Sequence, residues 1–205
     1  MKVLDVTEFY SQRGGGVRSH LTVKSHFSCQ VGHDQLVVAP GGVTREEPYA
    51  AFSVSQSKSG SGSQGSARVL HVGGPALPYD PTYHLLWRLD TVRRAIEEEH
   101  PDVLEIHSPY LAAMGALSVP RSSFGIRTFV WHADFIDTYL RGGMERRLPE
   151  KVVDAMVEPL WAWVRTIARG CDATFAAAKW QAEKLNAHGV ERVVHLPFGV
   201  EKEIF

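Results

Sequence analysis

Residues 2–6 read KVLDV, residues 14–16 read GGG and residues 35–39 read QLVVA, and no helix breaker interrupts the stretch from Val17 to Val31. A short apolar run bounded by turn residues is typical of a buried strand. Gly32 supplies a residue on which a helix commonly ends. The order of strand, glycine loop, helix and strand therefore predicts the opening of an α/β fold.

The same alternation continues along the rest of the chain. A helix that reaches about Glu99 is predicted by apolar residues that recur along one helical face, namely Leu85, Leu89, Val92 and Ile96. Further strands are expected at residues 68–72, 103–106, 126–131, 173–178 and 193–196, and further helices at 153–167, with a kink at Pro159, and at 181–188. This alternation predicts a Rossmann-like parallel sheet with helices on both faces.

Composition fits one globular domain over residues 1–205. Lys+Arg number 22 against Asp+Glu 23, a balance that disfavours nucleic-acid binding because phosphate neutralisation needs a basic surplus. No secretion signal and no apolar run of about 18 residues is visible, so we expect a cytoplasmic protein. Cys29 and Cys171 give no disulfide framework or zinc spacing. Serine and glycine dominate residues 53–66, which predicts a flexible surface loop within the domain.

Ligands of parallel α/β sheets bind beyond the carboxyl ends of the strands, and this rule selects the candidate site residues. Gly14, Gly15 and Gly16 lie between the first strand and the first helix, where bare backbone lets a phosphate approach helix-start N–H groups. A tight turn is the alternative interpretation. The pattern matches neither the dinucleotide-binding nor the phosphate-loop fingerprint, which disfavours NAD and ATP.

Polar residues follow two later strands. His132 comes directly after the apolar run at residues 128–131, with Asp134 close behind, and a histidine there can hydrogen-bond or carry a proton near pH 7. Three further candidate substrate-binding residues follow the strand expected at 103–106, namely His107, Ser108 and Tyr110. A purely structural role at the start of a polar loop is an equal alternative for His107 and Ser108.

Metal and nucleophile motifs are not found. The chain has no His-Glu-x-x-His, no Gly-x-Ser-x-Gly and no Asp-x-Asp, so we expect no metal site. Aromatic and basic residues mix at residues 139–147 and 161–169, as they do in helices that lie on membranes. Interspersed acidic residues favour an ordinary solvated face there, with peripheral membrane contact as the alternative.

Three passages, in their order, resemble the amino-terminal half of the two-domain glycosyltransferases of family 4. They are GGVRSH at 15–20 with VGHD at 31–34, FVWHAD at 129–134, and LPFGV at 196–200. The resemblance implies the GT-B architecture, in which two α/β domains face each other across a cleft. In that architecture the first domain holds the acceptor and the second holds most of the nucleotide-sugar donor. The resemblance also implies that the reaction needs no metal.

The resemblance also assigns roles to residues. It implies that Gly15 and Gly16, with Gly14 as a neighbour, contact the donor diphosphate and that His132 contacts the donor sugar. The sequence ends at Phe205, where the resemblance places the start of the donor domain. We therefore expect the donor domain to be absent from these 205 residues and this chain alone to be inactive. The donor domain would then act as a partner, in cis or in trans.

The expected activity is that of the amino-terminal half of a retaining, metal-independent glycosyltransferase. It would move a sugar from a nucleotide-diphosphate donor to a hydroxyl of a glycan or lipid-linked acceptor, with no cofactor, in the cytoplasm or at the inner face of the membrane. The alternative is a non-catalytic, stand-alone module that binds a glycan, a lipid or a protein. A nucleotide-dependent reductase is disfavoured by the glycine pattern.

Overall fold

The computed structural model describes residues 1–10, 15–49, 65–78 and 80–198. The chain divides into two compact units, the first comprising residues 1–127 and 198–205 and the second residues 128–197. Gly14 and nearly all of the predicted loop at 53–66 lie outside the described residues. The predicted α/β class is confirmed in both units, each of which contains parallel strands flanked by helices.

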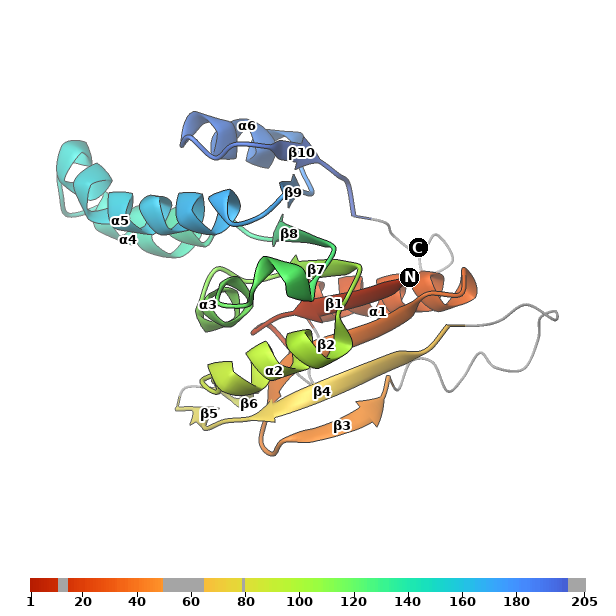
Figure 1. The fold of residues 1–205 in the computed structure, drawn as a ribbon. Helices are drawn as coiled ribbons and strands as arrows, with labels where there is room; N and C mark the ends of the chain where they lie inside the picture. Colours follow the sequence, from red (N-terminus) through yellow and green to blue (C-terminus); the bar gives the residue numbers. More distant parts are fainter. Residues whose placement is uncertain (11–14, 50–64, 79, 199–205) are drawn as a thin grey trace, which may run out of the picture. The chain divides into compact units, whose positions relative to one another are not determined.

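A mostly parallel sheet forms the centre of the first unit (Figure 1). Its strands, in spatial order, are β7 (Val103–Ile106), β1 (Lys2–Val6), β2 (Asp34–Gly41), β4 (Ala67–Gly73) and β3 (Arg45–Pro48). Only β3 runs antiparallel, against β4. A separate short hairpin joins β5 (Ala76–Leu77) to β6 (Asp80–His84).

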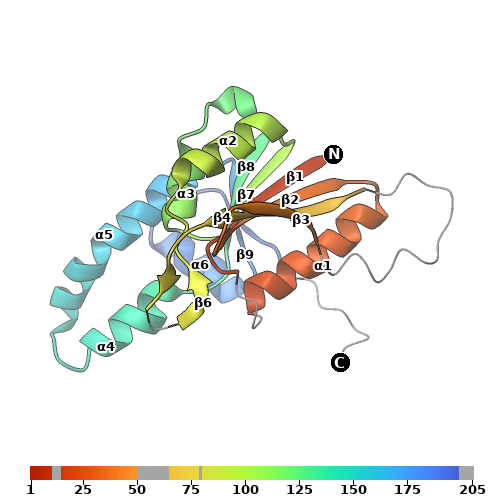
Figure 2. The ribbon, with the colours of Figure 1, turned by 90° about the horizontal axis from the view of Figure 1, so that it is seen from below.

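Helices cover both faces of this sheet, as Figure 2 shows for α1 on one side and α2 and α3 on the other. Their bounds are Gly16–Gln30 for α1, Leu89–Glu99 for α2 and Leu111–Leu117 for α3, with a short 3-10 turn η2 at Arg121–Ser123. Burial on both faces explains why β1 reads as a nearly continuous apolar run rather than an alternating one. Leu4, Val6 and Ile106 are fully buried at its centre.

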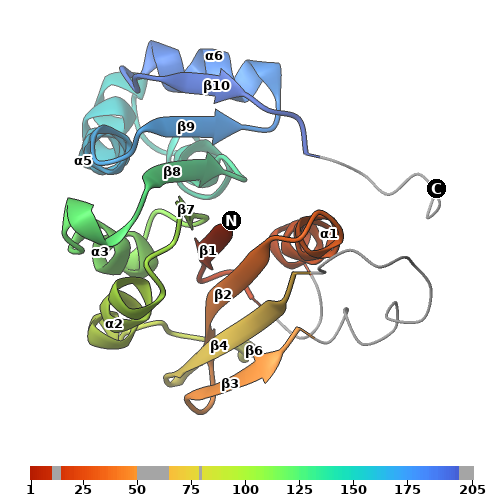
Figure 3. The same ribbon diagram turned by 45° about the vertical axis from the view of Figure 1, so that its right-hand side comes forward.

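The second unit has three parallel strands, which lie side by side in Figure 3. They are β8 (Ile126–Trp131, whose first two residues belong to the first unit), β9 (Ala173–Ala176) and β10 (Val193–His195). The helical elements are the π-helix η3 (Ile136–Arg141), α4 (Gly142–Met144), α5 (Glu150–Arg169) and α6 (Lys179–Ala187). Buried residues of α5 recur at helical spacing, at Val153, Val157, Trp161 and Val164.

The predicted helix over residues 85–99 begins too early. Leu85 lies before α2 and is 38% exposed, and its backbone N–H donates to the Pro75 carbonyl at 2.9 Å. This bond continues the pairing of the β5–β6 hairpin, so Leu85 matches the helical spacing by coincidence. The helix α5 continues on both sides of Pro159, from Glu150 to Arg169. None of the helices in the described part of the chain is long and apolar enough to cross a membrane.

Candidate functional site

The glycine loop leads directly into the first turn of α1. Gly15 is the N-cap with φ 134°, a backbone conformation that favours glycine, and in the described residues no side chain caps the helix or adds an acid to its first turn. Among the described residues outside the helix itself, no atom lies within 4 Å of the position that a Cβ on Gly16 would take. The first-turn N–H groups of α1 thus have no side-chain cap among the described residues, and such groups attract anions.

His107 lies in a buried cluster of charged side chains beneath α1. Asp5 of β1 and Glu105 of β7 are paired in register, and Lys24 of α1 reaches both carboxylates, at 2.6 and 2.9 Å. His107 Nε2 lies 2.7 Å from Asp5 Oδ1. Burial alone would raise the pKa of Asp5, but Lys24 and His107 hold that pKa well below its usual range.

Three of these side chains could offer ligand atoms to a metal. Those atoms of Asp5, Glu105 and His107 lie within 4.8 Å of one another, and no other such group occurs in the described ranges. The Lys24 ammonium already forms an ion pair with each of the two carboxylates. The contact with Asp5 keeps the His107 ring buried, and both the substrate-binding and the structural role of His107 stay predictions.

His20 extends the cluster toward the surface of α1. Its ring lies 5.9 Å from the ring of His107 and 4.4 Å from that of Phe198. Burial, together with the nearby His107 and Lys24 side chains, lowers the pKa of His20 to about 4, so the His20 imidazole is neutral at pH 7. Sequence reasoning missed this residue, although His20 and Lys24 are four residues apart in a predicted helix and so share one face.

Ser108 is buried behind Glu8 at the carboxyl end of β1. Its hydroxyl donates to Glu8 Oε2 at 2.8 Å, and the Ala112 N–H of α3 donates to Glu8 Oε1 at 3.0 Å. Burial raises the pKa of Glu8. Tyr110 differs from Ser108, because it is 39% exposed and contacts Phe9 edge to face, with ring centroids 5.7 Å apart.

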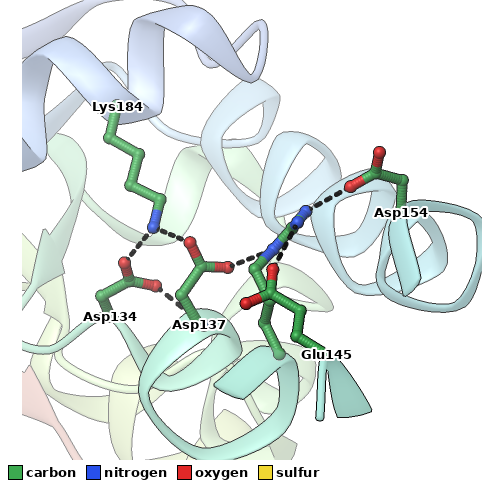
Figure 4. A network of polar contacts seen from close by, with 6 residues as sticks. Asp134, Asp137, Glu145, Asp154 and Lys184 are labelled. Atoms are coloured by element: carbon green, nitrogen blue, oxygen red, sulfur yellow. Dashed lines mark hydrogen bonds and ion pairs between the residues drawn. The ribbon is translucent and has the colours of Figure 1, made fainter. Parts of the chain in front are cut away.

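In the second unit, His132 follows the last residue of β8 and is half-buried. Asp134, two residues further, is buried and accepts the backbone N–H of Asp137 at 3.3 Å, which anchors the start of η3. Figure 4 shows Lys184 of α6 pointing at both Asp134 and Asp137, with which it forms ion pairs. The two carboxylates raise the pKa of Lys184 against the opposing effect of burial.

Arg141 continues this network at the end of η3. It pairs with Asp137 at 3.2 Å, with Glu145 at 3.2 Å and with Asp154 of α5 at 2.5 Å. The segment from Asp134 to Arg141 is therefore fixed by charge pairs to α5 and α6. Sequence reasoning named Asp134 as a candidate substrate-binding residue and did not name Lys184, which is the ammonium partner of Asp134.

A cavity of about 390 Å³ opens in the first unit, beyond the end of β2. Its lining includes Tyr10, Gly41, Gly42, Arg45, His71 and His84. This volume lies within the range of small-molecule sites, about 300–1,000 Å³. None of these residues was singled out from the sequence as a site residue, since they come from two loops, three strands of the sheet and the β5–β6 hairpin.

The sequence-predicted residues fall into two groups. The first unit holds Gly15, Gly16, His107, Ser108 and Tyr110, and the second holds His132 and Asp134. Their assigned roles stay predictions.

The comparisons with known proteins agree on one family. A family model described as Glycosyltransferase Family 4 matches residues 14–203. A GDP-mannose-dependent alpha-mannosyltransferase from Corynebacterium glutamicum is 25% identical over 209 residues, covering 100% of this chain and 45% of that protein. A GDP-mannose-dependent alpha-(1-6)-phosphatidylinositol dimannoside mannosyltransferase from Mycobacterium tuberculosis is 24% identical over 208 residues, covering 100% of this chain and 48% of that protein.

The fold is also found among solved structures. Sucrose-phosphate synthase from Thermosynechococcus elongatus matches with a TM-score of 0.64 at 10% identity, over 100% of this chain and 49% of that chain. The chain spans about half the length of the curated relatives it matches.

Proposed function

Because the chain belongs to glycosyltransferase family 4, we propose that it is the acceptor-side half of a glycosyltransferase that takes a sugar from a nucleotide-diphosphate donor. The two curated mannosyltransferases use GDP-mannose by name, which makes it the first donor to test. The observation that carries the proposal is the first turn of α1 behind Gly15, which has neither a side-chain cap nor an acid among the described residues.

The chemistry asks for positive potential at the leaving diphosphate, whose charge grows as the glycosidic bond breaks. Backbone N–H groups at the start of a helix provide that potential without a reorganisation cost. In this proposal Gly15 and Gly16 lie against the diphosphate and His132 hydrogen-bonds the donor sugar. Metal independence and retention of the anomeric configuration belong to the same proposal.

His132 needs a fixed backbone for this role, because a misplacement of about 1 Å can cost two orders of magnitude in rate. The anchors of the following segment, Asp134 to Lys184 and Arg141 to Asp154, support such fixation. The donor domain would supply the rest of the donor site, in cis or in trans.

The test is a transfer assay on the protein at the native length that intact mass establishes, with GDP-mannose and a glycan or lipid acceptor. We expect H132A to reduce kcat by at least about tenfold, as removal of one transition-state hydrogen bond does. H195A, which removes an exposed histidine of the same unit, is the matched control. Full activity of H132A would contradict its role.

Two further readouts test the other parts of the proposal. Chelation with EDTA should leave the rate unchanged, and the product anomer, read by NMR, should match that of the donor. Absence of transfer, even with a donor domain supplied in trans, would favour the non-catalytic binding module.

Peripheral membrane contact is proposed for the start of α5. Val152 and Met156 are exposed one turn apart on α5, and Leu148, just before the helix, is exposed as well. Arg146 and Arg147 precede them outside any ion pair of the described residues. We expect R146E/R147E to lose sedimentation with phosphatidylglycerol vesicles. The control, R93E/R94E, changes an adjacent pair on α2 that is engaged with Glu97 and Asp90. Equal sedimentation of both variants would contradict the contact.

A further inference from the structure

The cavity beyond β2 is shaped by two glycines and two histidines. A Cβ on Gly41 would come within 2.9 Å of the Cβ of His71, and a Cβ on Gly42 within 3.3 Å of the Nε2 of His84. The His71 imidazole thus occupies space that a side chain at position 41 would take, and the His84 imidazole would have to shift slightly for a side chain at position 42. The cavity wall consequently carries two imidazole rings, one from β4 and one from β6.

The same wall carries a permanent positive charge. Arg45 begins β3 and lines the cavity, whereas no carboxylate is among the described residues that line it. Two acids lie just behind the lining. Glu47 of β3 lies 3.2 Å from Arg45 Nε and 3.0 Å from His71 Nε2, and the Asp80 carboxylate accepts from the hydroxyl of the lining residue Thr82 at 2.6 Å. Glu47 therefore neutralises part of this charge from outside the lining.

An aromatic side completes the cavity. Tyr10 lines it, with its ring edge toward His71 at 5.9 Å between centroids, and the Arg18 guanidinium lies 5.3 Å from the centre of the Tyr10 ring. Burial raises the pKa of Tyr10, so its phenol stays neutral and adds no negative charge. An aromatic ring in the same lining as hydrogen-bond donors and a cation fits a polyol ring that carries an anion.

From this lining we propose that the cavity binds the acceptor through a phosphate group carried on a polyol, with Arg45 as its charged contact and His71 and His84 as hydrogen-bonding partners. That this ligand is the acceptor rests on the proposed glycosyltransferase function, whereas the binding of a polyol phosphate does not. The phosphate can belong to a free sugar phosphate or to a lipid head group, since both present the same oxygens.

The experiment measures equilibrium binding to the full chain by calorimetry. Glucose 6-phosphate should bind saturably and at least tenfold more tightly than glucose. R45Q should weaken this binding at least fivefold, and E47Q should tighten it, because Glu47 competes for Arg45. The control R88Q removes an arginine of similar exposure that also pairs with an acid two residues on, Asp90, away from the cavity.

A second arm identifies the source of the phosphate. Dihexanoyl phosphatidylglycerol, kept below its micelle concentration, replaces glucose 6-phosphate in the same series of variants. The proposal is supported if the affinity for either compound is lower in R45Q and unchanged in R88Q. The compound that binds shows whether the phosphate belongs to a sugar phosphate or to a lipid head group. No binding of either compound, or equal effects of R45Q and R88Q, would overturn it.

The outcome is separable from that of the transfer assay. R45Q should raise the KM for a phosphate-bearing acceptor and leave the KM for the donor unchanged. Binding of a polyol phosphate without any transfer would retain the cavity inference and reject the proposed function. Transfer activity with an unchanged acceptor KM in R45Q would support the proposed function and reject the cavity inference.

Discussion

A lysine from a following helix bridges two carboxylates in each unit of the protein. In the first unit Lys24 of α1 holds Asp5 and Glu105, and in the second Lys184 of α6 holds Asp134 and Asp137. Asp5 and Glu105 lie on strands, Asp134 lies in the loop after β8, and Asp137 lies in the first turn of η3. Leaving either pair of acids without its ammonium would bring two like charges together in a largely desolvated place.

Substitution of Lys184 tests this residue-scale argument. K184M leaves Asp134 and Asp137 facing each other, so we expect a loss of about 2 kcal/mol in the free energy of unfolding, between the values for exposed and buried pairs. Urea titration followed by tryptophan fluorescence measures it. K179M, at an exposed lysine of the same helix, should change stability by less than about 0.5 kcal/mol. The double variant K184M/D137N should recover part of the loss, and an unchanged K184M would contradict the bridge.

His20 should make stability depend on pH. Its pKa is about 4 in the folded protein, below the ordinary value of 6.5, so the unfolded chain binds the proton first as the pH falls. The stability that neutral His20 contributes is thus complete above pH 6.5 and decreases toward pH 4. We expect the wild type to lose about 1–2 kcal/mol more than H20Q across this window, allowing for solvent screening. Parallel profiles of the two proteins would contradict this expectation.

At the scale of elements, strands with two buried faces were the most predictable. The sequence runs at 103–106 and 126–131 agree with β7 and β8, and the helix expected at 17–31 agrees with α1 to within one residue at each end. The edge strand β3, with sequence REEP, has no apolar signal, because its pairing to β4 uses backbone groups. The short helix α3, seven residues long, is too brief for helical periodicity to stand out.

The candidate site was predictable only in part, for a related reason. Residues at strand ends, such as Gly15 and His132, follow from the α/β pattern together with the family resemblance. The cavity residues Arg45, His71 and His84 come from an edge strand, an inner strand and a hairpin, so only the fold brings them together. Burial of His107 and Ser108 likewise depends on Asp5 and Glu8, about a hundred residues earlier in the chain.

Pro159 offers a prediction about a single element. It lies inside α5 with an exposed side chain, and its ring nitrogen cannot donate to the carbonyl one turn earlier. P159A restores that donor, so we expect the free energy of unfolding to rise by about 1–2 kcal/mol. P149A makes the same change at the N-cap of α5, where the backbone N–H makes no bond within the helix. We expect P149A to change the free energy of unfolding by less than P159A does. Urea midpoints compare them, and a destabilised P159A would show that α5 requires the proline.

For the whole molecule, the overall charge of −1 conceals strongly local electrostatics. The start of α1 and the cavity beyond β2 are both free of acidic side chains among the described residues that form them. The acids are instead paired, with Lys24 in one unit and with Lys184 and Arg141 in the other. Net charge therefore excludes a broad basic surface but says nothing against sites that bind phosphate groups.

The division into two compact units predicts that they open separately. Leu104 is fully buried in the first unit and Val157 is 2% exposed in the second. L104A should lower the opening free energy by about 3 kcal/mol and V157A by about 2 kcal/mol, as cavity-creating substitutions do. Amide hydrogen exchange should place the loss from L104A in β1, β2 and β7, and the loss from V157A in β9 and α5. If L104A lowered protection equally in both units, the two would form a single cooperative unit, and H132A and R45Q would then have to be assayed for stability before either was interpreted as a change in binding.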